Sequence, residues 1–354
     1  MRPQILASMA VLLASLASGA LECSSAPPKS PEAQHGGDIY RRMCAVCHGD
    51  SGEGYKADRA PALAQPDFLA SVSDTFLRNA VAFGRGGTTM NAWSKDRAGP
   101  LSREDIDAVV GFLRSWQERP RAALDERPLG GDAGRGAIAY AQECSRCHGV
   151  NGLGGNYESI GSPDLLDGAS DGFLRYAIRN GRPGTPMPAF GASLHEQGVE
   201  DVIALLRSWQ ASTAGVRPPP ARPPPIPLGP VPLHANGPEP VGFNTYPKTT
   251  PADVIKAQLD RGAKIGLLDA RAPSAYLDEH IKGAVNVPFY EPDPYIDALP
   301  KDAWLVCYCA CPHAESGQLA QKLQSKGFTK VTVLDEGLGV WRNRNYETSK
   351  GIDP

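Results

Sequence analysis

Two stretches of the chain, "GGDIYRRMCAVCHGDSGEG" (residues 36–54) and "RGAIAYAQECSRCHGVNGLG" (residues 135–154), share a pattern of two cysteines followed by a histidine. The pattern consists of Cys44, Cys47 and His48 in the first stretch and of Cys144, Cys147 and His148 in the second. On one helical turn this spacing lets two thiols form thioethers with the vinyl groups of a haem while the adjacent His faces the iron. Zinc knuckles and redox-active cysteine pairs also contain Cys-x-x-Cys, so the surrounding sequence must decide between these kinds of site.

The repeat continues well beyond the cysteines. "DTFLRNAVAFGRGGTTMNAW" (residues 74–93) pairs with "DGFLRYAIRNGRPGTPMPAF" (residues 171–190), and "LSREDIDAVVGFLRSWQ" (residues 101–117) pairs with "LHEQGVEDVIALLRSWQ" (residues 194–210). The last pair predicts a closing helix in each copy, with apolar residues on one face that pack in the core, and Ser102 as the cap of the first. Both copies are therefore built on one plan.

The second axial ligand of each iron can be sought by elimination, because the chain has five methionines. Two lie in the N-terminal apolar run, and Met43 is beside Cys44 and cannot reach the opposite face of a haem. Met90 and Met187 remain, each about 40 residues after the His of its copy. The alternative is that both pack in the core. Prolines flank Met187 in a Gly-rich loop, where a stiff backbone aims a side chain, and this favours ligation.

Residues 36–212 resemble two tandem class I cytochrome c domains, at residues 36–120 and 131–212. The resemblance covers the attachment motif, the Met loop and the terminal helix in both copies. It implies two all-α domains, each with one covalently bound haem c held by His and Met, that transfer electrons. A thioether ligand raises the reduction potential relative to two His ligands, which suits redox protein partners such as an electron donor and a terminal oxidase or peroxidase.

Residues 1–22 contain a single Arg followed by an apolar run from Ile5 to about Ala20, which is typical of a signal peptide. Cys23 and the polar residues 23–35 resemble the lipidated cysteine and tether of a bacterial lipoprotein, although Glu22 stands where that motif has a small residue. Membrane attachment through a lipidated Cys23, cleavage after Ala20 and an uncleaved anchor are the three alternatives. Each of them places the mature chain in the periplasm, where haem c is attached.

A Pro-rich segment at residues 213–246 separates the repeat from the rest of the chain. Its composition favours an extended polyproline conformation. It is either a spacer that lets one part reach a partner or a linker that lies along a domain surface.

Residues 247–350 alternate between helical and strand patterns, which predicts a small α/β domain with a parallel sheet. Predicted strands are "KIGLLDA" (264–270), "WLVCYC" (304–309) and "KVTVLDE" (330–336), and Thr249 or Thr250 with Pro251 marks a helix start. In such a sheet, active sites form at the carboxyl ends of strands, which here means the loop "ACPHAES" (310–316).

This segment resembles a rhodanese domain through "LLDARAPSAYLDEHIKGAVNVPF" (267–289) and "VLDEGLGVW" (333–341). The resemblance implies that Cys309, which closes the central strand, is the catalytic residue and carries sulfur as a persulfide. Backbone N–H groups and the start of the following helix would stabilise that anion. Glu315 stands where a basic residue is usual, so we expect an anionic donor such as thiosulfate to be held less well.

Other interpretations of the same loop remain open. Cys307 points to the same side of the strand as Cys309 and is expected to be buried and inert. Cys309, Cys311 and His313 could ligate a metal, Cys309 and Cys311 could form a redox-labile disulfide, or the domain could only bind a partner.

Composition and charge set the outer limits of function. The chain has 354 residues, is 41% hydrophobic and carries a formal net charge of −3, which gives no indication of a nucleic-acid partner. The sequence thus predicts a multidomain, exported dihaem electron carrier with a small α/β domain that carries sulfur on Cys309. The presence of both on one chain suggests a link between sulfur-compound oxidation and electron transport. The alternative is a respiratory carrier whose last domain is a non-catalytic binding module.

Overall fold

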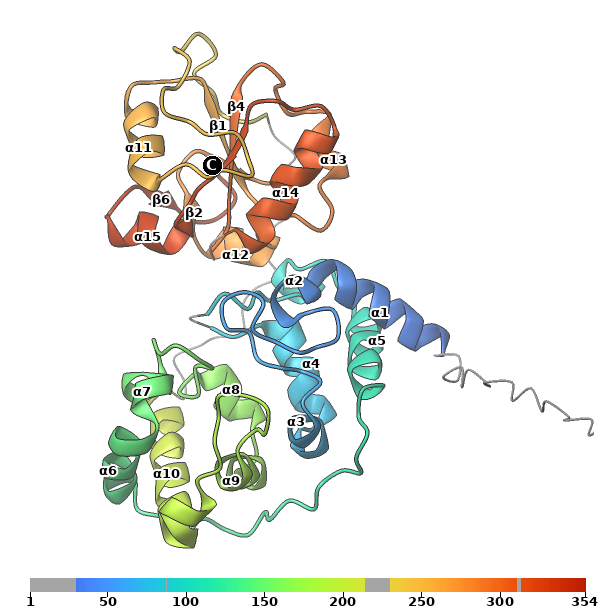
Figure 1. Ribbon diagram of the computed structural model, residues 1–354, viewed down its shortest axis with the longest axis vertical. Coiled ribbons are helices and arrows are strands. Elements are labelled where there is room, and N and C mark those ends of the chain that lie inside the picture. Colours follow the sequence, from blue (N-terminus) through green and yellow to red (C-terminus); the bar gives the residue numbers. More distant parts are fainter. Residues whose placement is uncertain (1–29, 87, 214–229, 311–312) are drawn as a thin grey trace, which may run out of the picture.

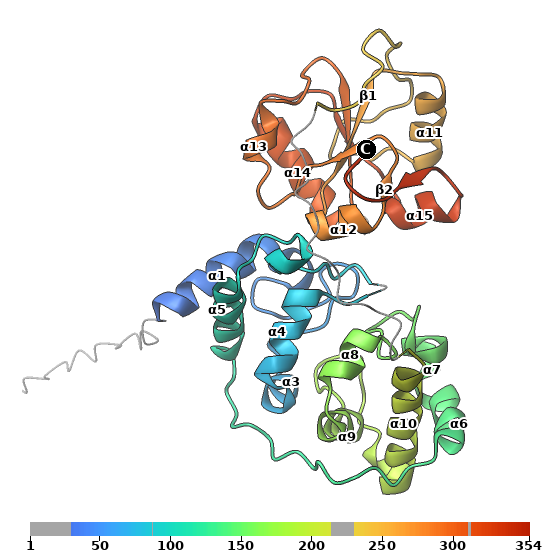
Figure 2. The ribbon, with the colours of Figure 1, turned by 180° about the vertical axis from the view of Figure 1, so that it is seen from behind.

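A computed structural model describes residues 30–86, 88–213, 230–310 and 313–354. It shows two helical domains and an α/β module, with the first helical domain lying between the other two (Figures 1 and 2). We call these parts domain 1, domain 2 and the C-terminal module. Within the described residues, no helix is both long and apolar enough to span a membrane.

Domain 1 consists of short helices with polar caps. Ser102 forms a capping box with Asp105 at the start of α5, as its sequence predicts. Ser73 caps α4 with its side chain alone, through a bond from the N–H of Phe76 to its hydroxyl. The helices are α1 (Pro31–Met43), α2 (Ala45–His48), α3 (Pro66–Ser71), α4 (Asp74–Phe83) and α5 (Arg103–Arg114), with a 3-10 turn at Lys95–Arg97.

Domain 2 repeats this order, which confirms the duplicated plan. Its helices are α6 (Ala133–Glu143), α7 (Ser145–His148), α8 (Pro163–Gly168), α9 (Asp171–Asn180) and α10 (Gly191–Thr213), with a 3-10 turn at Val150–Gly152. One difference lies at His195, which occupies the position of the capping Ser102. His195 has a φ of 52°, so the backbone of α10 breaks there before the long helix begins.

In each helical domain the first helix crosses the last one closely, α1 on α5 and α6 on α10. Gly36 and Gly136 lie at the two crossings. A Cβ atom added at Gly36 would lie 2.0 Å from the carbonyl oxygen of Ala108, and one added at Gly136 would lie 2.0 Å from that of Asp201. Only glycine permits this approach, which brings the attachment helix and the closing helix into one core.

The C-terminal module has a four-stranded parallel sheet of order β3-β1-β4-β5 and a two-stranded antiparallel pair, β2-β6. The strands are β1 (Ile265–Asp269), β2 (His280–Ile281), β3 (Ala284–Asn286), β4 (Trp304–Tyr308), β5 (Val331–Val333) and β6 (Thr348–Ser349). The helices are α11 (Ala252–Asp260), α12 (Pro273–Asp278), α13 (Asp293–Ile296), α14 (Ala314–Ser325) and α15 (Gly337–Asn343). The parallel sheet confirms the predicted α/β fold.

Helices cover both faces of this sheet (Figure 1). Cys307 packs in the core beneath α14, whereas Tyr308 belongs to the core beneath α11 and α15. The helix start near Thr250 differs in detail from the prediction. Pro251 is the cap residue, the Thr250 hydroxyl bonds to Thr332 at 2.7 Å, and Glu336 accepts the N–H of Ala252.

The two helical domains pack through aromatic residues. Phe76 of α4 lies against Phe173 of α9, with ring centroids 5.3 Å apart. Tyr55 and Tyr157, which follow the two attachment motifs, meet edge to face at 6.4 Å. The phenylalanines occupy matching positions of the repeat, and the tyrosine pair brings the segments that follow both attachment motifs to the shared boundary.

Candidate functional site

The first attachment motif lies on one turn of helix. Cys44 links α1 to α2, and its carbonyl oxygen accepts bonds from the N–H groups of Cys47 (3.1 Å) and His48 (2.9 Å). The hydroxyl of Tyr40 in α1 donates to the carbonyl of Gly49 at 2.7 Å and so holds the end of this turn. The turn therefore presents both thiols and the imidazole together, as the spacing predicts.

The imidazole of His48 is oriented by the loop that follows. Its Nδ1 donates to the carbonyl of Pro61 at 2.9 Å, which leaves the lone pair of Nε2 available to a metal. Burial lowers the pKa of His48, so the ring stays neutral, as a ligand must be.

Domain 2 reproduces this arrangement. Cys144 accepts from the N–H groups of Cys147 (3.0 Å) and His148 (3.0 Å), and Nδ1 of His148 donates to the carbonyl of Glu158 at 2.8 Å. Tyr140, at the position of Tyr40, donates to Gly149 at 2.8 Å. The two tyrosines and the two carbonyl acceptors were missed by the sequence reasoning, although the tyrosine recurs four residues before each motif.

The two methionine loops share a set of hydrogen bonds. In domain 1 the N–H of Arg85 bonds to the carbonyl of Met90 at 3.0 Å, and the Thr88 hydroxyl accepts the N–H of Met90 at 3.1 Å. In domain 2 the bonds run from Arg182 to Met187 at 2.9 Å and from Met187 to the Thr185 hydroxyl at 3.2 Å. The shared threonine therefore braces the backbone of both loops, and the prolines that flank Met187 are particular to domain 2.

These residues fit a haem c in each helical domain. Each set contains two neighbouring thiols, an imidazole with Nε2 available and a thioether in a braced loop, which are the groups that attach and ligate a c-type haem. Trp116 and Trp209 close the two cores against Tyr40 and Tyr140, with ring centroids 5.1 and 5.0 Å apart.

The residues around Cys309 belong to the carboxyl edge of the parallel sheet. Cys309 directly follows β4 and has no exposed surface, and its Sγ lies 3.2 Å from the Ser316 hydroxyl in the first turn of α14. On β1, the carboxylate of Asp269 binds the guanidinium of Arg271 and accepts the Tyr308 hydroxyl at 2.9 Å. The bond from Tyr308 to Asp269 joins the carboxyl ends of β1 and β4 next to Cys309.

Glu315 contributes a buried carboxyl group to the same place. It is only 7% exposed, and burial raises its pKa well above the usual range, with the charge of Cys309 adding to the effect. The Nδ2 of Asn91, which follows Met90 in domain 1, donates to Glu315 at 3.3 Å. The sequence identified Glu315 as unusual, but its partner lies 224 positions away in the chain.

The remaining predictions for this loop have different outcomes. Cys307 is fully buried and burial raises its pKa, in agreement with an inert thiol. His313 directs Nε2 to the carbonyl of Asp335 at 2.8 Å. Cys311 lies outside the described residues, so the metal and disulfide interpretations that include it stay predictions, as do those on Cys23 and the start of the chain.

Two family models match the chain. The model described as cytochrome c oxidase, cbb3-type, subunit III matches residues 31–113 and 131–206, and the rhodanese-like domain model matches residues 251–344. The fold and the sites thus define tandem cytochrome c domains, which covalently bind haem c, followed by a rhodanese-like domain.

Individual relatives agree with this division. The chain is 28% identical to the cbb3-type cytochrome c oxidase subunit CcoP of Azospirillum sp. over 49% of its own length and 60% of the relative. It is 34% identical to the thiosulfate sulfurtransferase GlpE of Pseudomonas fluorescens over 29% of its own length and 94% of the relative. A solved rhodanese-like domain from Anabaena is 31% identical, with 29% of this chain and 80% of that chain covered and a TM-score of 0.28.

The chain therefore belongs, through its C-terminal module, to the rhodanese-like family, and its helical part consists of tandem cytochrome c domains similar to those of the CcoP and FixP subunits. It spans about three fifths of the length of the CcoP and FixP relatives from Azospirillum sp. and Bradyrhizobium sp..

Proposed function

We propose that this protein is a periplasmic dihaem cytochrome c whose C-terminal module carries sulfur as a persulfide of Cys309. The observation that carries the proposal is the duplicated site. Two motif turns, two histidines with Nδ1 bonded to a carbonyl and two threonine-braced methionine loops recur in the two helical domains. Domains of this kind supply one-electron transfer when haem c is bound.

In this proposal the thiols of Cys44, Cys47, Cys144 and Cys147 attach the two haems. His48 and Met90 are the axial ligands in domain 1, and His148 and Met187 those in domain 2. The carbonyls of Pro61 and Glu158 keep each imidazole in the tautomer that a metal requires.

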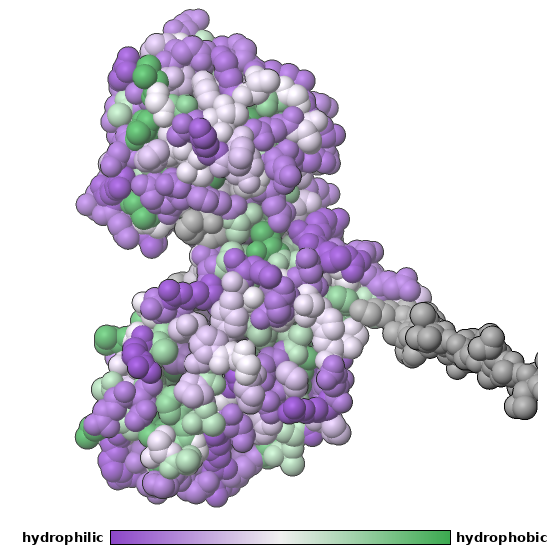
Figure 3. Space-filling model, viewed as in Figure 1, coloured by the Kyte–Doolittle hydropathy of each residue, from purple (hydrophilic) through white to green (hydrophobic). Residues whose placement is uncertain are grey.

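Exposed apolar side chains occur on both sides of the second attachment motif in the sequence. Ile138, Val150 and Leu153, which flank the second motif in sequence, are 63%, 77% and 46% exposed. Apolar residues are visible at the surface of this lower part of the molecule (Figure 3). An apolar surface of this kind supports docking of redox protein partners, an electron donor and a terminal oxidase or peroxidase.

The test uses the chain matured in a host that attaches haem c. We expect haem absorbance, divided by protein mass, to give two haems per chain. The variants Cys44→Ala/Cys47→Ala and Cys144→Ala/Cys147→Ala should each hold one haem. Cyanide should release sulfane sulfur from the wild-type chain and none from Cys309→Ser. One haem in the wild-type chain, or equal sulfane sulfur in Cys309→Ser, would contradict the corresponding half of the proposal.

A second candidate is a respiratory carrier whose rhodanese-like domain only docks a partner. The observation in its favour is that Cys309 has no exposed surface. If this candidate is right, Cys309→Ser leaves both the sulfur content and the electron-transfer rates unchanged.

A further inference from the structure

The C-terminal module packs against domain 1 through the chain that directly follows Met90. Asn91 donates to Glu315, the carbonyl of Ala92 accepts the Ser274 hydroxyl at 2.8 Å, and the ring of Trp93 lies 5.5 Å from that of Tyr290. Three consecutive residues thus contact three different parts of the module.

The repeat itself shows that these contacts are particular to domain 1. The loop "GRGGTTMNAW" of domain 1 corresponds to "GRPGTPMPAF" of domain 2, so Pro188 and Phe190 stand at the positions of Asn91 and Trp93. Proline has no side-chain donor for a carboxyl group, and it replaces the residue that binds Glu315. Domain 1 therefore carries the residues that recognise the module.

The same interface brings the attachment helix of domain 1 to the cysteine of the module. Helix α2, which carries Cys47 and His48, packs against α14, whose first turn holds Glu315 and Ser316. Ser316 in that turn lies 3.2 Å from the Sγ of Cys309, so the helix that carries the first attachment motif packs against the helix that borders Cys309.

The charges around Cys309 disfavour an anionic sulfur donor. Arg271 is the cation that acts on Glu315, but both oxygens of Asp269 bind its guanidinium, at 2.9 and 2.6 Å. Asp58 adds a further negative charge. A dianion such as thiosulfate would lose its water of hydration at this site and meet no unpaired cation among these residues, which is unfavourable.

We propose that Cys309 takes its sulfur from inorganic sulfide and that the electrons released leave through domain 1. This inference rests on the Cys309 persulfide proposed above. Hydrogen sulfide is small and uncharged in its protonated form, so it can enter a buried site where the one cation acting on Glu315, Arg271, is already paired with Asp269. Glu315 is the residue that sets this preference, because it replaces the base that would hold an anion.

The reaction balances with two one-electron acceptors. The Cys309 thiol and hydrogen sulfide each lose one S–H proton to water and form one S–S bond, which gives the persulfide, two protons and two electrons. The acceptors are oxidised c-type haem centres, of which the chain has residues to hold two. A haem held by Cys44, Cys47 and His48 would be the nearer acceptor because α2 contacts α14, and one held in domain 2 would supply the second oxidising equivalent across the boundary at Tyr55 and Tyr157.

The experiment mixes the oxidised holoprotein with sulfide or thiosulfate at equal concentration and measures two quantities. Mass spectrometry of the peptide that contains Cys309 gives the added sulfur, and haem absorbance gives the electrons. We expect sulfide to add one sulfur atom with two electrons per chain, and thiosulfate to load Cys309 at least tenfold more slowly.

Variants of the carboxyl group test the charge argument. Glu315→Lys should raise loading from thiosulfate at least tenfold, and Glu347→Lys, at a position whose side chain is 71% exposed, should not. Glu315→Gln has an uncharged side chain of the same shape and adds no positive charge, so the preference for sulfide over thiosulfate should stay unchanged. This variant tests the charge argument even if Glu315→Lys does not fold.

The outcomes separate the inference from the proposed function. Loading by thiosulfate as fast as by sulfide in the wild-type chain overturns the inference and leaves the persulfide intact. Sulfide that adds sulfur to Cys309 without reducing the haems overturns the electron route. A Cys309 that no sulfur donor loads overturns the persulfide itself, and with it this part of the proposed function.

Discussion

Replacing Arg175 should destabilise domain 2 far more than replacing its counterpart Arg78 destabilises domain 1. Both arginines occupy the same position of the repeat, and each pairs with a carboxylate of the closing helix, Arg175 with Glu200 and Arg78 with Asp107. The side chains of the first pair are 1% and 7% exposed, and those of the second pair are 43% and 44% exposed. The repeat therefore supplies a matched control within one chain.

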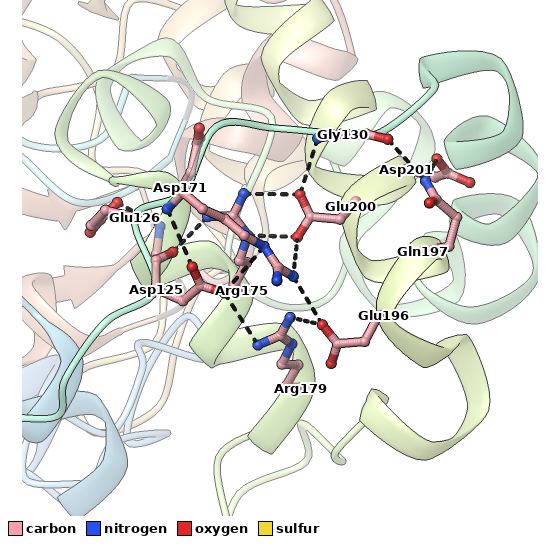
Figure 4. A network of polar contacts seen from close by, with 12 residues as sticks. Asp125, Glu126, Gly130, Asp171, Arg175, Arg179, Glu196, Gln197, Glu200 and Asp201 are labelled. Atoms are coloured by element: carbon pink, nitrogen blue, oxygen red, sulfur yellow. Dashed lines mark hydrogen bonds and ion pairs between the residues drawn. The ribbon is translucent and has the colours of Figure 1, made fainter.

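The reason for the difference is the segment between the domains, which crosses the pair in domain 2 (Figure 4). The carbonyl of Asp125 accepts from Arg175 at 2.6 Å, and the N–H of Gly130 points to Glu200 at 3.5 Å. The guanidinium binds both oxygens of Glu200, at 2.6 and 2.9 Å. Removal of the arginine leaves a buried carboxylate whose remaining cationic neighbour, Arg127, is 3.6 Å away and half exposed to water.

The expected magnitudes follow from burial. Arg175→Met, which keeps the apolar stem, should lower the free energy of unfolding of domain 2 by about 3–5 kcal/mol, the usual cost of breaking a buried ion pair. Arg78→Met should cost about 0.2–1 kcal/mol, because its pair is exposed to water. The double variant Arg175→Met/Glu200→Leu should recover more than half of the loss, since no buried charge remains.

Hydrogen exchange of the holoprotein, read peptide by peptide, measures the stability of each domain separately, which a single melting curve of a multidomain chain does not. Peptides of α9 and α10 report on domain 2, and peptides of α4 and α5 report on domain 1. Equal losses for Arg175→Met and Arg78→Met, within about 1 kcal/mol, would refute the reasoning that burial sets the cost.

Three further predictions concern other parts of the chain. Thr185→Val removes the hydroxyl that braces the Met187 loop and with it two hydrogen bonds of about 1 kcal/mol each. In a spectroelectrochemical titration this variant should lower one of the two reduction potentials. Thr88→Val should lower the other. Hydrogen bonds from Arg135 lower the pKa of Asp201 to about 2. The pair therefore stabilises domain 2 fully above about pH 4, which is the pKa of an Asp in an unfolded chain. This stabilisation is lost as the pH falls toward 2. Acid unfolding of Asp201→Asn should lack that component, and an unchanged pH profile would contradict it. Arg271→Lys loses the two-pronged bond to the fully buried Asp269 and should lower the free energy of unfolding of the C-terminal module by about 3 kcal/mol, measured by exchange of β1 and β4 amides.

Much of the fold could be read from local patterns. The attachment turns, the capping of α5 and the core strands β1 and β4 depend on residues within a few positions of one another, so their spacing predicts them. The strands β2, β3 and β6 were missed because they are two or three residues long and carry no measurable alternation. The cap of α11 was misplaced because Thr250 finds its partner, Thr332, on a neighbouring segment of the sheet.

The sequence by itself determined which groups this protein holds: two sets of thiols, imidazole and thioether, one cysteine at the end of a central strand, and an acidic residue where a base is usual. Only the tertiary structure decided which helical domain meets that cysteine. Asn91 contacts Glu315, and α2 contacts α14, across more than two hundred residues of chain. Spacing within a motif reports on neighbours along one helix or strand, whereas burial and charge pairing depend on surfaces that meet only when the domains pack. For the same reason Arg78 and Arg175, alike in sequence, differ in burial.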